Sequence, residues 1–455
     1  FLDGMDIVNL SSGSPALFTQ DDRGTICSKD AGVACDVQVE AVENAVKSGM
    51  TVVVSGGNSG DFGGQLPTLN TIYTPGTAPG AITVGATTNS HIYFSSVQLP
   101  GSDTPADLRR ILALFGNGPK PARPLTAPLR DVSKLDDDGK ACSSLTNGSL
   151  DGAIALILRG DCGFVTKVAN AQKAGAAGVV LYQAEGNSIF PPYGLEESGI
   201  PAVLIGNRDG QSLKGFLATH PDRPVTLDAT LKAENAPADE VAFFSSQGPN
   251  IGTGGIKPEL VAVGTDLYMP TQSFDPNGDM YDPGRYTNAQ GTSFAAPMVA
   301  GAVALVKQRN PSWGAAQLKS AVVNTAVSQK LVDYDYSGTA VAARVTAVGA
   351  GKLNAADAVR ANVTVSPSTL DFGVIGTGAL PSIGLRITNN SNAALQLSVQ
   401  PREAGGNARV TLSASSAPAG QTTQITARLE GARPAPGQYE GVVVVRGGAV
   451  DLRVP

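Results

Sequence analysis

The sequence predicts a multidomain protein, with an α/β core, an α/β domain inserted into that core and a final all-β sandwich. Strand-like and helix-like segments alternate in residues 1–97 and again in 238–360, which is typical of a parallel sheet covered by helices. Residues 98–237 interrupt this pattern with an α/β unit of their own. Residues 361–455 contain short alternating strands with polar turns, as in a β-sandwich.

The first core segment begins with a buried strand in "MDIVNLS". An amphipathic helix follows in "DVQVEAVENAVKSG", where Gly49 ends it. Two further buried strands are predicted in "MTVVVSGGN" and "AITVGATT". The opening "FLDGMD" is typical of a helix end with Gly4 as its stop, so we expect that the chain is cut from a longer one and that the core lacks its N-terminal part.

The inserted segment begins with a proline-rich, weakly periodic stretch up to about residue 130. Its α/β unit follows as a strand in "GAIALILRGDC", a helix in "GFVTKVANAQKAGA" and a strand in "AGVVLYQ". A strand, turn and helix in "IPAVLIGNRDGQSLKGFL" and a last strand in "RPVTLDATL" complete it.

The second core segment carries strand and loop in "EVAFFSSQGPN" and "KPELVAVGTDLYMP". Next come a buried helix from "GTSFAAP" and an amphipathic helix in "SWGAAQLKSAVVNTA". The sandwich strands are predicted in "VTVSPSTLDFGVI", "PSIGLRITNNSN", "ALQLSVQP", "RVTLSAS", "TTQITARLEG" and "GQYEGVVVVRGG", before a last strand, "AVDLRVP", that looks cut at its end.

Composition excludes several classes of function. The net charge is -6 and there is no basic cluster, so nucleic-acid binding has little electrostatic support. No apolar stretch reaches the roughly 18 to 20 residues that a membrane span needs, since the longest candidate, Ala295 to Val306, has about a dozen. A charged content of 16% with 54 glycines and 30 prolines fits a loop-rich secreted chain.

The four cysteines fall into two local pairs. No CxxC is present and both histidines lie elsewhere, so we predict no zinc site. Two disulfides, which imply an oxidising compartment, are the better interpretation, and four separate buried thiols are the alternative. The residues concerned are Cys27, Cys35, Cys142 and Cys162.

A small, glycine-flanked serine, Ser293, precedes a long apolar run in "NAQGTSFAAPMVAGAVALV". Gly291 permits a tight turn, so we predict Ser293 at the N-terminus of a buried helix, where free N–H groups favour negative charge. This is the setting of an activated nucleophile whose own N–H helps to hold an oxyanion. A serine that merely caps the helix is an equal alternative on these residues alone.

This run closely resembles the nucleophile motif of subtilisin-like serine proteases (subtilases), GTS-x-AAP-x-VAG, and meets each of its fixed positions. "VVVSGGNSG" is similar to the family's turn with the oxyanion asparagine, here Asn58, whose amide donates without titrating. Without the resemblance, Asn58 is typical of a turn residue beside Gly57. The resemblance implies Ser293 as nucleophile, Asn58 as oxyanion donor and Thr292 as support beside it.

Two further blocks resemble subtilases. "DIVNLSSGS" resembles the strand that lines the cleft, and small residues with free backbone groups suit the addition of a substrate strand. Ordinary exits from two strands are the alternative. "FSSQGPN…IKPELVAVG" resembles the FSSxGP…KPD-VAPG block, with Glu259 for the usual Asp and Val263 for the usual Pro. In the serine motif, Met298 stands where many relatives have His. The implied substrate-binding residues are Ser11, Ser12 and Gly13 on one wall and Ser55, Gly56 and Gly57 on the other.

The family's base and its carboxylate are missing from this sequence. Neither a D-[ST]-G-like strand end nor an HGT-x-VAG helix start occurs, and the histidines, His91 and His220, lie in polar, loop-like settings. We therefore expect the triad Asp and His upstream of Phe1, and the chain alone to be inactive. A non-catalytic binding protein on a subtilase scaffold is the alternative, although an intact serine motif favours the secreted serine endopeptidase.

The inserted unit closely resembles the protease-associated (PA) domain of large subtilases, through "LDGAIALILRGDCGFVTKVANAQKAGAAGVVLYQ". The resemblance implies a Cys142–Cys162 disulfide and a module that covers the cleft and biases the choice of substrate or partner. A domain that only fills space between two protease strands is the alternative. The tail resembles fibronectin-III-like or immunoglobulin-like domains in general pattern only, and its role would be bracing, spacing or cell-surface contact.

The implied chemistry, hydrolysis of a protein or peptide substrate, requires no cofactor. Many subtilases bind calcium, but no compact acidic cluster indicates a structural calcium site here, and Asp136 to Asp138 in "KLDDDGK" are more typical of a solvated turn. Three asparagines match the short N-glycosylation motif, namely Asn147, Asn362 and Asn389.

Overall fold

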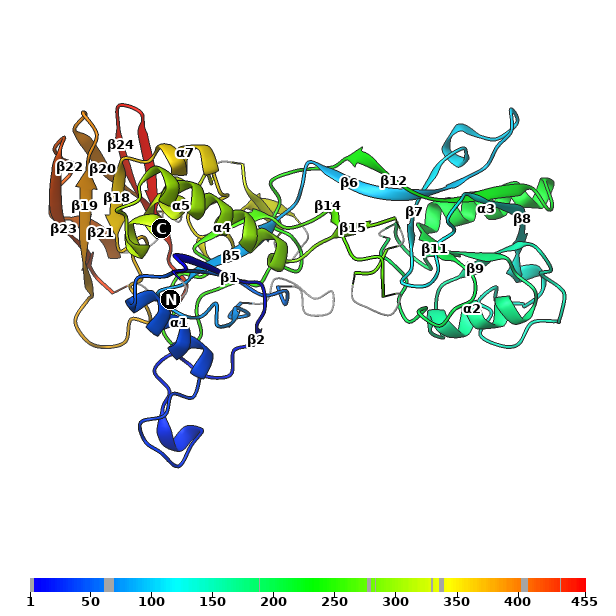
Figure 1. Ribbon diagram of the computed structural model, residues 1–455, viewed down its shortest axis with the longest axis horizontal. Coiled ribbons are helices and arrows are strands. Elements are labelled where there is room, and N and C mark those ends of the chain that lie inside the picture. The colour runs from blue at the N-terminus through cyan, green and yellow to red at the C-terminus, as the bar shows by residue number, and fades with distance from the viewer. Residues whose placement is uncertain are drawn as a thin grey trace. The chain divides into compact units, whose positions relative to one another are not determined.

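The computed structural model describes residues 4–60, 69–187, 189–275, 280–282, 284–328, 330–334, 339–401, 408–433 and 435–455. The chain divides into two compact units (Figure 1). The first consists of Phe1–Ser90, Ala236–Leu267 and Asn288–Pro455, and the second of His91–Asn235 and Tyr268–Thr287. The helix end predicted before Gly4 falls on residues outside the described ones.

A parallel sheet forms the centre of the first unit. Its order is β1 (Ile7–Leu10), β3 (Thr51–Ser55), β5 (Ile82–Thr87) and β13 (Leu260–Val263), and all three pairings are parallel. Every residue of β3 and β5 is buried, as expected for central strands that are covered on both faces. The sequence prediction of a parallel α/β core is confirmed.

Helices cover both faces of this sheet because successive residues of a strand point to opposite sides. Val52 and Val54 pack with α1 (Val37–Lys47), whereas Val53 packs with α4 (Thr292–Arg309). The remaining helices of this unit are α5 (Ala315–Asn324), α6 (Val345–Val348) and α7 (Ala355–Arg360), and its short strand pairs are β2 (Ser14–Pro15) with β4 (Tyr73–Thr74) and β16 (Val332–Tyr334) with β17 (Ala340–Ala342).

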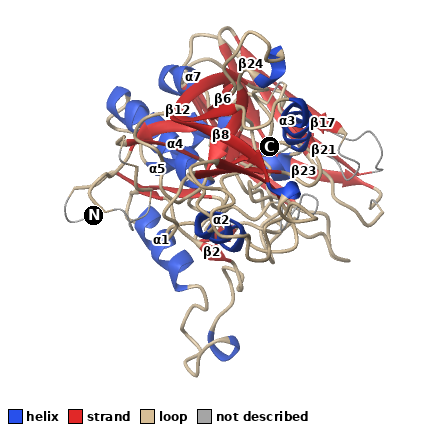
Figure 2. Ribbon diagram, turned by 90° about the vertical axis from the view of Figure 1, so that its right-hand side faces the viewer, coloured by secondary structure: helices blue, strands red, loops and turns tan. Residues whose placement is uncertain are grey.

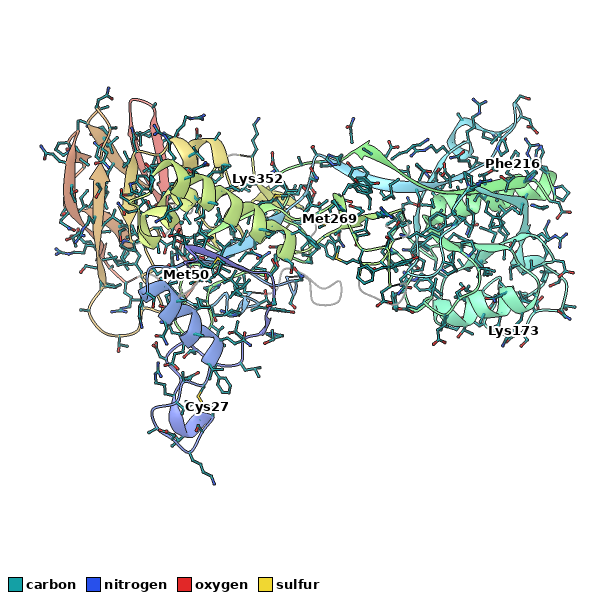
Figure 3. All side chains as sticks on the ribbon, in the orientation of Figure 1. Cys27, Met50, Lys173, Phe216, Met269 and Lys352 are labelled. Atoms are coloured by element: carbon teal, nitrogen blue, oxygen red, sulfur yellow. A yellow bond between two sulfur atoms is a disulfide. The ribbon has the colours of Figure 1, made fainter. Side chains whose placement is uncertain are left out.

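Two segments of the first unit lie outside its regular helices and strands. The loop between β2 and α1 contains a 3-10 turn (Gly24–Ile26) and is closed by the Cys27–Cys35 disulfide, seen at the labelled Cys27 in Figure 3. "EVAFFSS" forms only isolated bridges at Glu240 and Val241 rather than a strand, because the chain turns back where Ser245 N–H donates to Ala242 O.

The second unit is a closed barrel, and Figure 2 shows its strands β6, β8 and β12 side by side. The order is β10 (Gly178–Tyr182), β11 (Ala202–Ile205), β7 (Ile111–Phe115), β6 (His91–Gln98), β12 (Pro224–Asn235), β8 (Leu125–Asp131) and β9 (Ile154–Leu158). The helices are α2 (Phe164–Lys173) and α3 (Asn207–Thr219), and 3-10 turns lie at Ala106–Leu108 and Val132–Lys134. A separate two-stranded sheet pairs β14 (Leu267–Pro270) with β15 (Tyr286–Ala289). The Cys142–Cys162 bond is present, so both predicted disulfides are confirmed.

Two barrel strands, β7 and β8, lie in the proline-rich stretch for which no strand was predicted. β7 pairs with β6 and with the distant β11, and β8 pairs with the distant β9 and β12. Their alternate residues fill the barrel core. Most of these partners are far away in the sequence, so the weak local pattern gave no signal for them.

The C-terminal segment forms two antiparallel sheets that share one apolar core. One contains β18 (Val363–Ser366), β19 (Ser382–Asn389), β23 (Gln421–Gly431) and β21 (Ala408–Leu412), and the other β22 (Ser416–Ala417), β20 (Leu395–Pro401), β24 (Gly441–Gly447) and β25 (Val450–Val454). The prediction of an antiparallel β tail is confirmed. Asn389, one of the three asparagines that match the N-glycosylation motif, is fully buried and its amide donates to three backbone carbonyls, so it is no surface site for a glycan.

Among the described residues, no helix has both the length and the apolar content that crossing a membrane requires.

Candidate active site

Ser293 lies in the first turn of α4, and Gly291 rather than Ser293 is the N-cap residue. Gly291 has φ 145°, a region that favours glycine, and its N–H donates to Gly264 O at 2.8 Å. The glycine therefore turns the chain sharply from β15 into the helix. The alternative of a simple N-cap serine is wrong, because Ser293 is already helical and its side chain is available for another role.

Ser11 is joined to Ser293 by two hydrogen bonds. Pro297 inside α4 has no N–H to give to the carbonyl four residues earlier, which is that of Ser293. The Ser11 hydroxyl donates to this carbonyl at 2.7 Å. In return, the Ser293 hydroxyl donates to Ser11 O at 3.1 Å. The end of β1 thus positions the serine and repairs the gap that the proline leaves in the helix.

The Asn58 side chain is held from the buried side by Thr292. Its Oδ1 accepts from Thr292 N–H and from the Thr292 hydroxyl, both at 2.9 Å. Thr292 Oγ1 in turn accepts from Gly57 N–H at 3.1 Å. Because both partners of Oδ1 are donors, the orientation of the amide is fixed, and its NH₂ is turned away from them. Asn58 is exposed and its Nδ2 lies 3.4 Å from the point where a Cβ on Gly291 would stand.

Two donors lie at the N-terminus of α4. One is the Asn58 amide, and the other is the Ser293 N–H, which belongs to the first helical turn, where a helix offers no internal acceptor. The positive end of the α4 dipole adds to their effect. This arrangement suits a small anion or a carbonyl oxygen that gains negative charge next to the Ser293 hydroxyl.

The two predicted walls differ from each other in the structure. Ser11 is half-buried and Ser12 and Gly13 are exposed. Residues 55–57 are buried, and Gly56 and Gly57 already use their N–H and C=O groups in internal hydrogen bonds. The expectation of free backbone groups is wrong for this second segment, which can border a substrate but has no spare groups there to pair with it.

Both histidines of the chain belong to the second unit. His220 stacks on Phe216 at 4.1 Å, and its Nδ1 lies 2.9 Å from Thr219 Oγ1. His91 is the first residue of strand β6, so its predicted loop-like setting is wrong, and its ring contacts Tyr93 edge-on. The first unit, which carries Ser293, contains no histidine, so it offers Ser293 no imidazole base.

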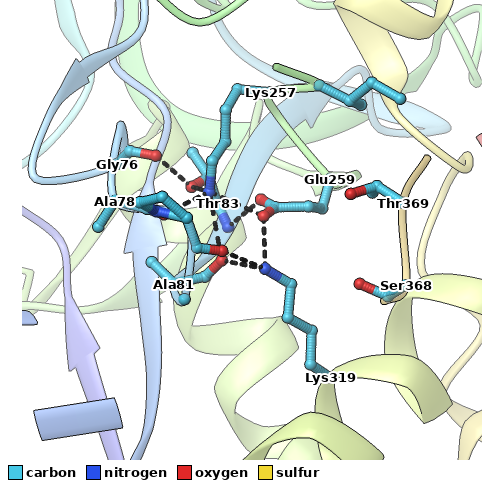
Figure 4. A network of polar contacts seen from close by, with 12 residues as sticks. Gly76, Ala78, Ala81, Thr83, Lys257, Glu259, Lys319, Ser368 and Thr369 are labelled. Carbon is cyan, nitrogen blue, oxygen red and sulfur yellow. Dashed lines mark hydrogen bonds and ion pairs between the residues drawn. The ribbon is translucent and has the colours of Figure 1, made fainter. Parts of the chain in front are cut away.

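A buried ion cluster, which the sequence did not indicate beyond the departure at Glu259, supports the sheet of the first unit (Figure 4). Glu259 Oε1 lies 2.7 Å from the ammonium groups of both Lys257 and Lys319. Lys257 also donates to Ala78 O and to Thr83 Oγ1. The second carboxylate oxygen accepts from Thr83 N–H, which ties the residue before β13 to β5.

The cluster has two cations and one anion, and this balance of charges shifts the pKa values of Glu259 and Lys257. Burial alone raises the pKa of Glu259, but the two neighbouring ammonium groups outweigh it and hold that pKa below its ordinary value. Burial lowers the pKa of Lys257 to about 8, and Lys319 adds to this effect while Glu259 opposes it. Glu259 is therefore the group that makes the burial of these lysines tolerable.

A sequence profile described as the subtilase family matches residues 2–357. The chain belongs to the subtilase family. It is 30% identical to "Minor extracellular protease Vpr" of Bacillus subtilis, over 100% of this chain and 52% of that protein. It is also 30% identical to "Subtilisin-like protease SBT5.4" of Arabidopsis thaliana, over 71% of this chain and 39% of that protein. It is 28% identical to "C5a peptidase" of Streptococcus pyogenes, over 67% of this chain and 24% of that protein.

This subtilase chain spans about half the length of Vpr and less of the other two relatives. Membership assigns it to a family of serine endopeptidases, whose substrates are proteins or peptides. The roles of the individual residues rest on the geometry described above.

Proposed function

We propose that this chain is the C-terminal portion of a secreted subtilisin-like serine endopeptidase. The observation that carries the proposal is the fixed Asn58 amide, which Thr292 directs towards the N-terminus of α4 beside Ser293. Ser293 Oγ attacks the scissile carbonyl, and its own N–H and the Asn58 NH₂ hold the oxyanion. For the attack, the hydroxyl exchanges its bond to Ser11 O for one to a base.

The base and the carboxylate that orients it come, in this proposal, from polypeptide upstream of this chain. Two features support a docking place for it in the first unit. Within the described residues β1 is the outer strand of the parallel sheet, and its free edge can accept another strand. The nearby face of α4 is apolar and exposed, with Met298 39% and Leu305 51% accessible.

We further propose that the barrel unit is a PA domain that biases the choice of substrate or partner. In this division the subtilase core comprises 1–97 and 238–360 and the PA domain 98–237. The second compact unit differs from it, because it begins at His91 with β6 and also includes Tyr268–Thr287. The tail, 361–455, is proposed as a fibronectin-III-like domain for bracing or cell-surface contact. The chemistry needs no cofactor, and in the part of the chain that the structure describes no three His, Cys, Asp or Glu side chains gather as metal ligands.

The alternative function is a non-catalytic binding protein on the subtilase scaffold, which the lack of a histidine in the first unit favours. The two functions differ in a hydrolysis assay. The whole protein is expected to cleave a fluorogenic peptide, whereas residues 1–455 alone are expected to be slower by at least about 10³, because serine and oxyanion donors without a base retain only residual catalysis. A whole protein no faster than residues 1–455 would favour the binding function.

Replacing Asn58 by Ala in the whole protein is expected to lower kcat by about 10² to 10³ with little change in KM, because the donor acts mainly in the transition state. The magnitude comes from the same kind of substitution in a subtilisin. Steady-state kinetics on one peptide substrate measure it. Asn70→Ala is the control, since the side-chain amide of this exposed asparagine donates to Pro249 O, and a loss at Asn58 no larger than at Asn70 would remove Asn58 from the mechanism.

A further inference from the structure

Tyr73 lies between the two segments that the sequence assigns to the substrate cleft. It belongs to β4, whose pairing with β2 places Pro15 opposite Tyr73 and Ser14 opposite Thr74. A Cβ on Gly13 would stand 3.3 Å from the Tyr73 Cβ. On its other side, Tyr73 N–H donates to Gly56 O at 2.9 Å. A single residue therefore borders both walls.

The Tyr73 ring fills the space next to Gly57. A Cβ on Gly57 would come within 2.6 Å of the ring atoms Cγ and Cδ1, so the ring lies directly against the backbone of this glycine. The phenol oxygen is 2.6 Å from Ser59 Oγ. Backbone pairing fixes the ring at its base and this hydrogen bond fixes it at its tip. Asn58, the oxyanion donor proposed above, is the residue between Gly57 and Ser59.

We propose that Tyr73 restricts the substrate residue whose carbonyl Ser293 attacks to small side chains such as Gly, Ala and Ser. This inference rests on the proposed function. A substrate carbonyl held by Asn58 and Ser293, with its backbone along residues 11–13, directs the side chain of that residue towards the opposite wall, where it meets the ring. The phenyl group takes up the volume that a large substrate side chain needs, and displacing it breaks the contact with Ser59.

The whole protein provides the first test, with fluorogenic peptides that differ only at the residue before the scissile bond. We expect kcat/KM for Ala at this position to exceed that for Phe by at least about tenfold, in the range that pocket size usually gives. A preference for Phe or Leu over Ala would overturn the inference. This measurement needs no variant, so it holds even if a substitution at Tyr73 impairs folding.

Tyr73→Ala provides the second test and Tyr73→Phe is its matched control. The ratio of kcat/KM for Phe to that for Ala is expected to rise at least about tenfold in Tyr73→Ala and to stay within about threefold of the wild type in Tyr73→Phe, which keeps the ring. Labelling of Ser293 by a fluorophosphonate separates the two ways of failing. An unlabelled wild type contradicts the proposed function, whereas a labelled Tyr73→Ala enzyme with an unchanged ratio contradicts only the role of Tyr73.

Discussion

Ser293→Ala is expected to lower kcat of the whole protein by about 10⁶, the largest effect of any single substitution in this chain. The magnitude is that of removing the nucleophile in a subtilisin. The change deletes the hydroxyl that attacks the carbonyl, and it also deletes the bond to Ser11 O. It leaves Asn58 and the bond from Ser11 to the Ser293 carbonyl in place, so substrate binding should persist. We therefore expect a large fall in kcat with KM changed by no more than a few fold.

The control for this prediction is Ser48→Ala. Ser48 follows α1 and its hydroxyl donates to Asn44 O, at an exposed place away from the cleft. The kcat of the Ser48→Ala enzyme should stay within about twofold of the wild type, as is usual for a surface substitution. If Ser293→Ala retained more than about a hundredth of the wild-type kcat, another group would have to be the nucleophile.

Glu259→Gln is expected to destabilise the first unit by about 3 to 5 kcal/mol, because it leaves two ammonium groups beside a buried neutral amide. Glu259 is 2% exposed and contacts both Lys257 and Lys319. The loss of the negative charge also weakens the tie to β5 through Thr83 N–H. The midpoint of denaturant unfolding of this unit measures the effect.

Two variants show whether charge is the cause of this loss. Glu259→Asp keeps the charge on a shorter side chain, and its cost should be clearly smaller than that of Glu259→Gln. Glu259→Gln combined with Lys257→Met removes one of the uncompensated cations, so it should be more stable than Glu259→Gln alone. A loss of unfolding free energy below about 1 kcal/mol in Glu259→Gln would contradict this explanation. It would mean that water reaches the cluster and solvates the two lysine ammonium groups.

The sequence predicted those parts of the fold that depend on local pattern. The buried strand at Thr51–Ser55 and the helix at Val37–Lys47 follow directly from apolar periodicity and from their glycine stops. The strands at Ile111–Phe115 and Leu125–Asp131 did not, because most of their partners in the barrel are distant in the sequence. Pairing across such distances leaves little trace in a short window of residues.

The candidate site shows the same division. Ser293 and Asn58 were found because each lies in an extended motif, and the structure brings both to the start of α4. Tyr73 was missed, since nothing next to it in the sequence indicates that its ring lies against Gly57. The reciprocal bonds of Ser11 with Ser293 were missed as well, because they join positions 282 residues apart.

The central claim is that Ser293 is an activated nucleophile once a base is supplied, and labelling by a fluorophosphonate tests it most directly. The reagent forms a covalent bond to an activated serine oxygen, and peptide mass spectrometry locates that bond. We predict labelling of the whole protein at Ser293, abolished in Ser293→Ala and much slower in residues 1–455 alone. A whole protein that binds peptides but remains unlabelled at Ser293 would contradict the account and leave a binding protein on a subtilase scaffold.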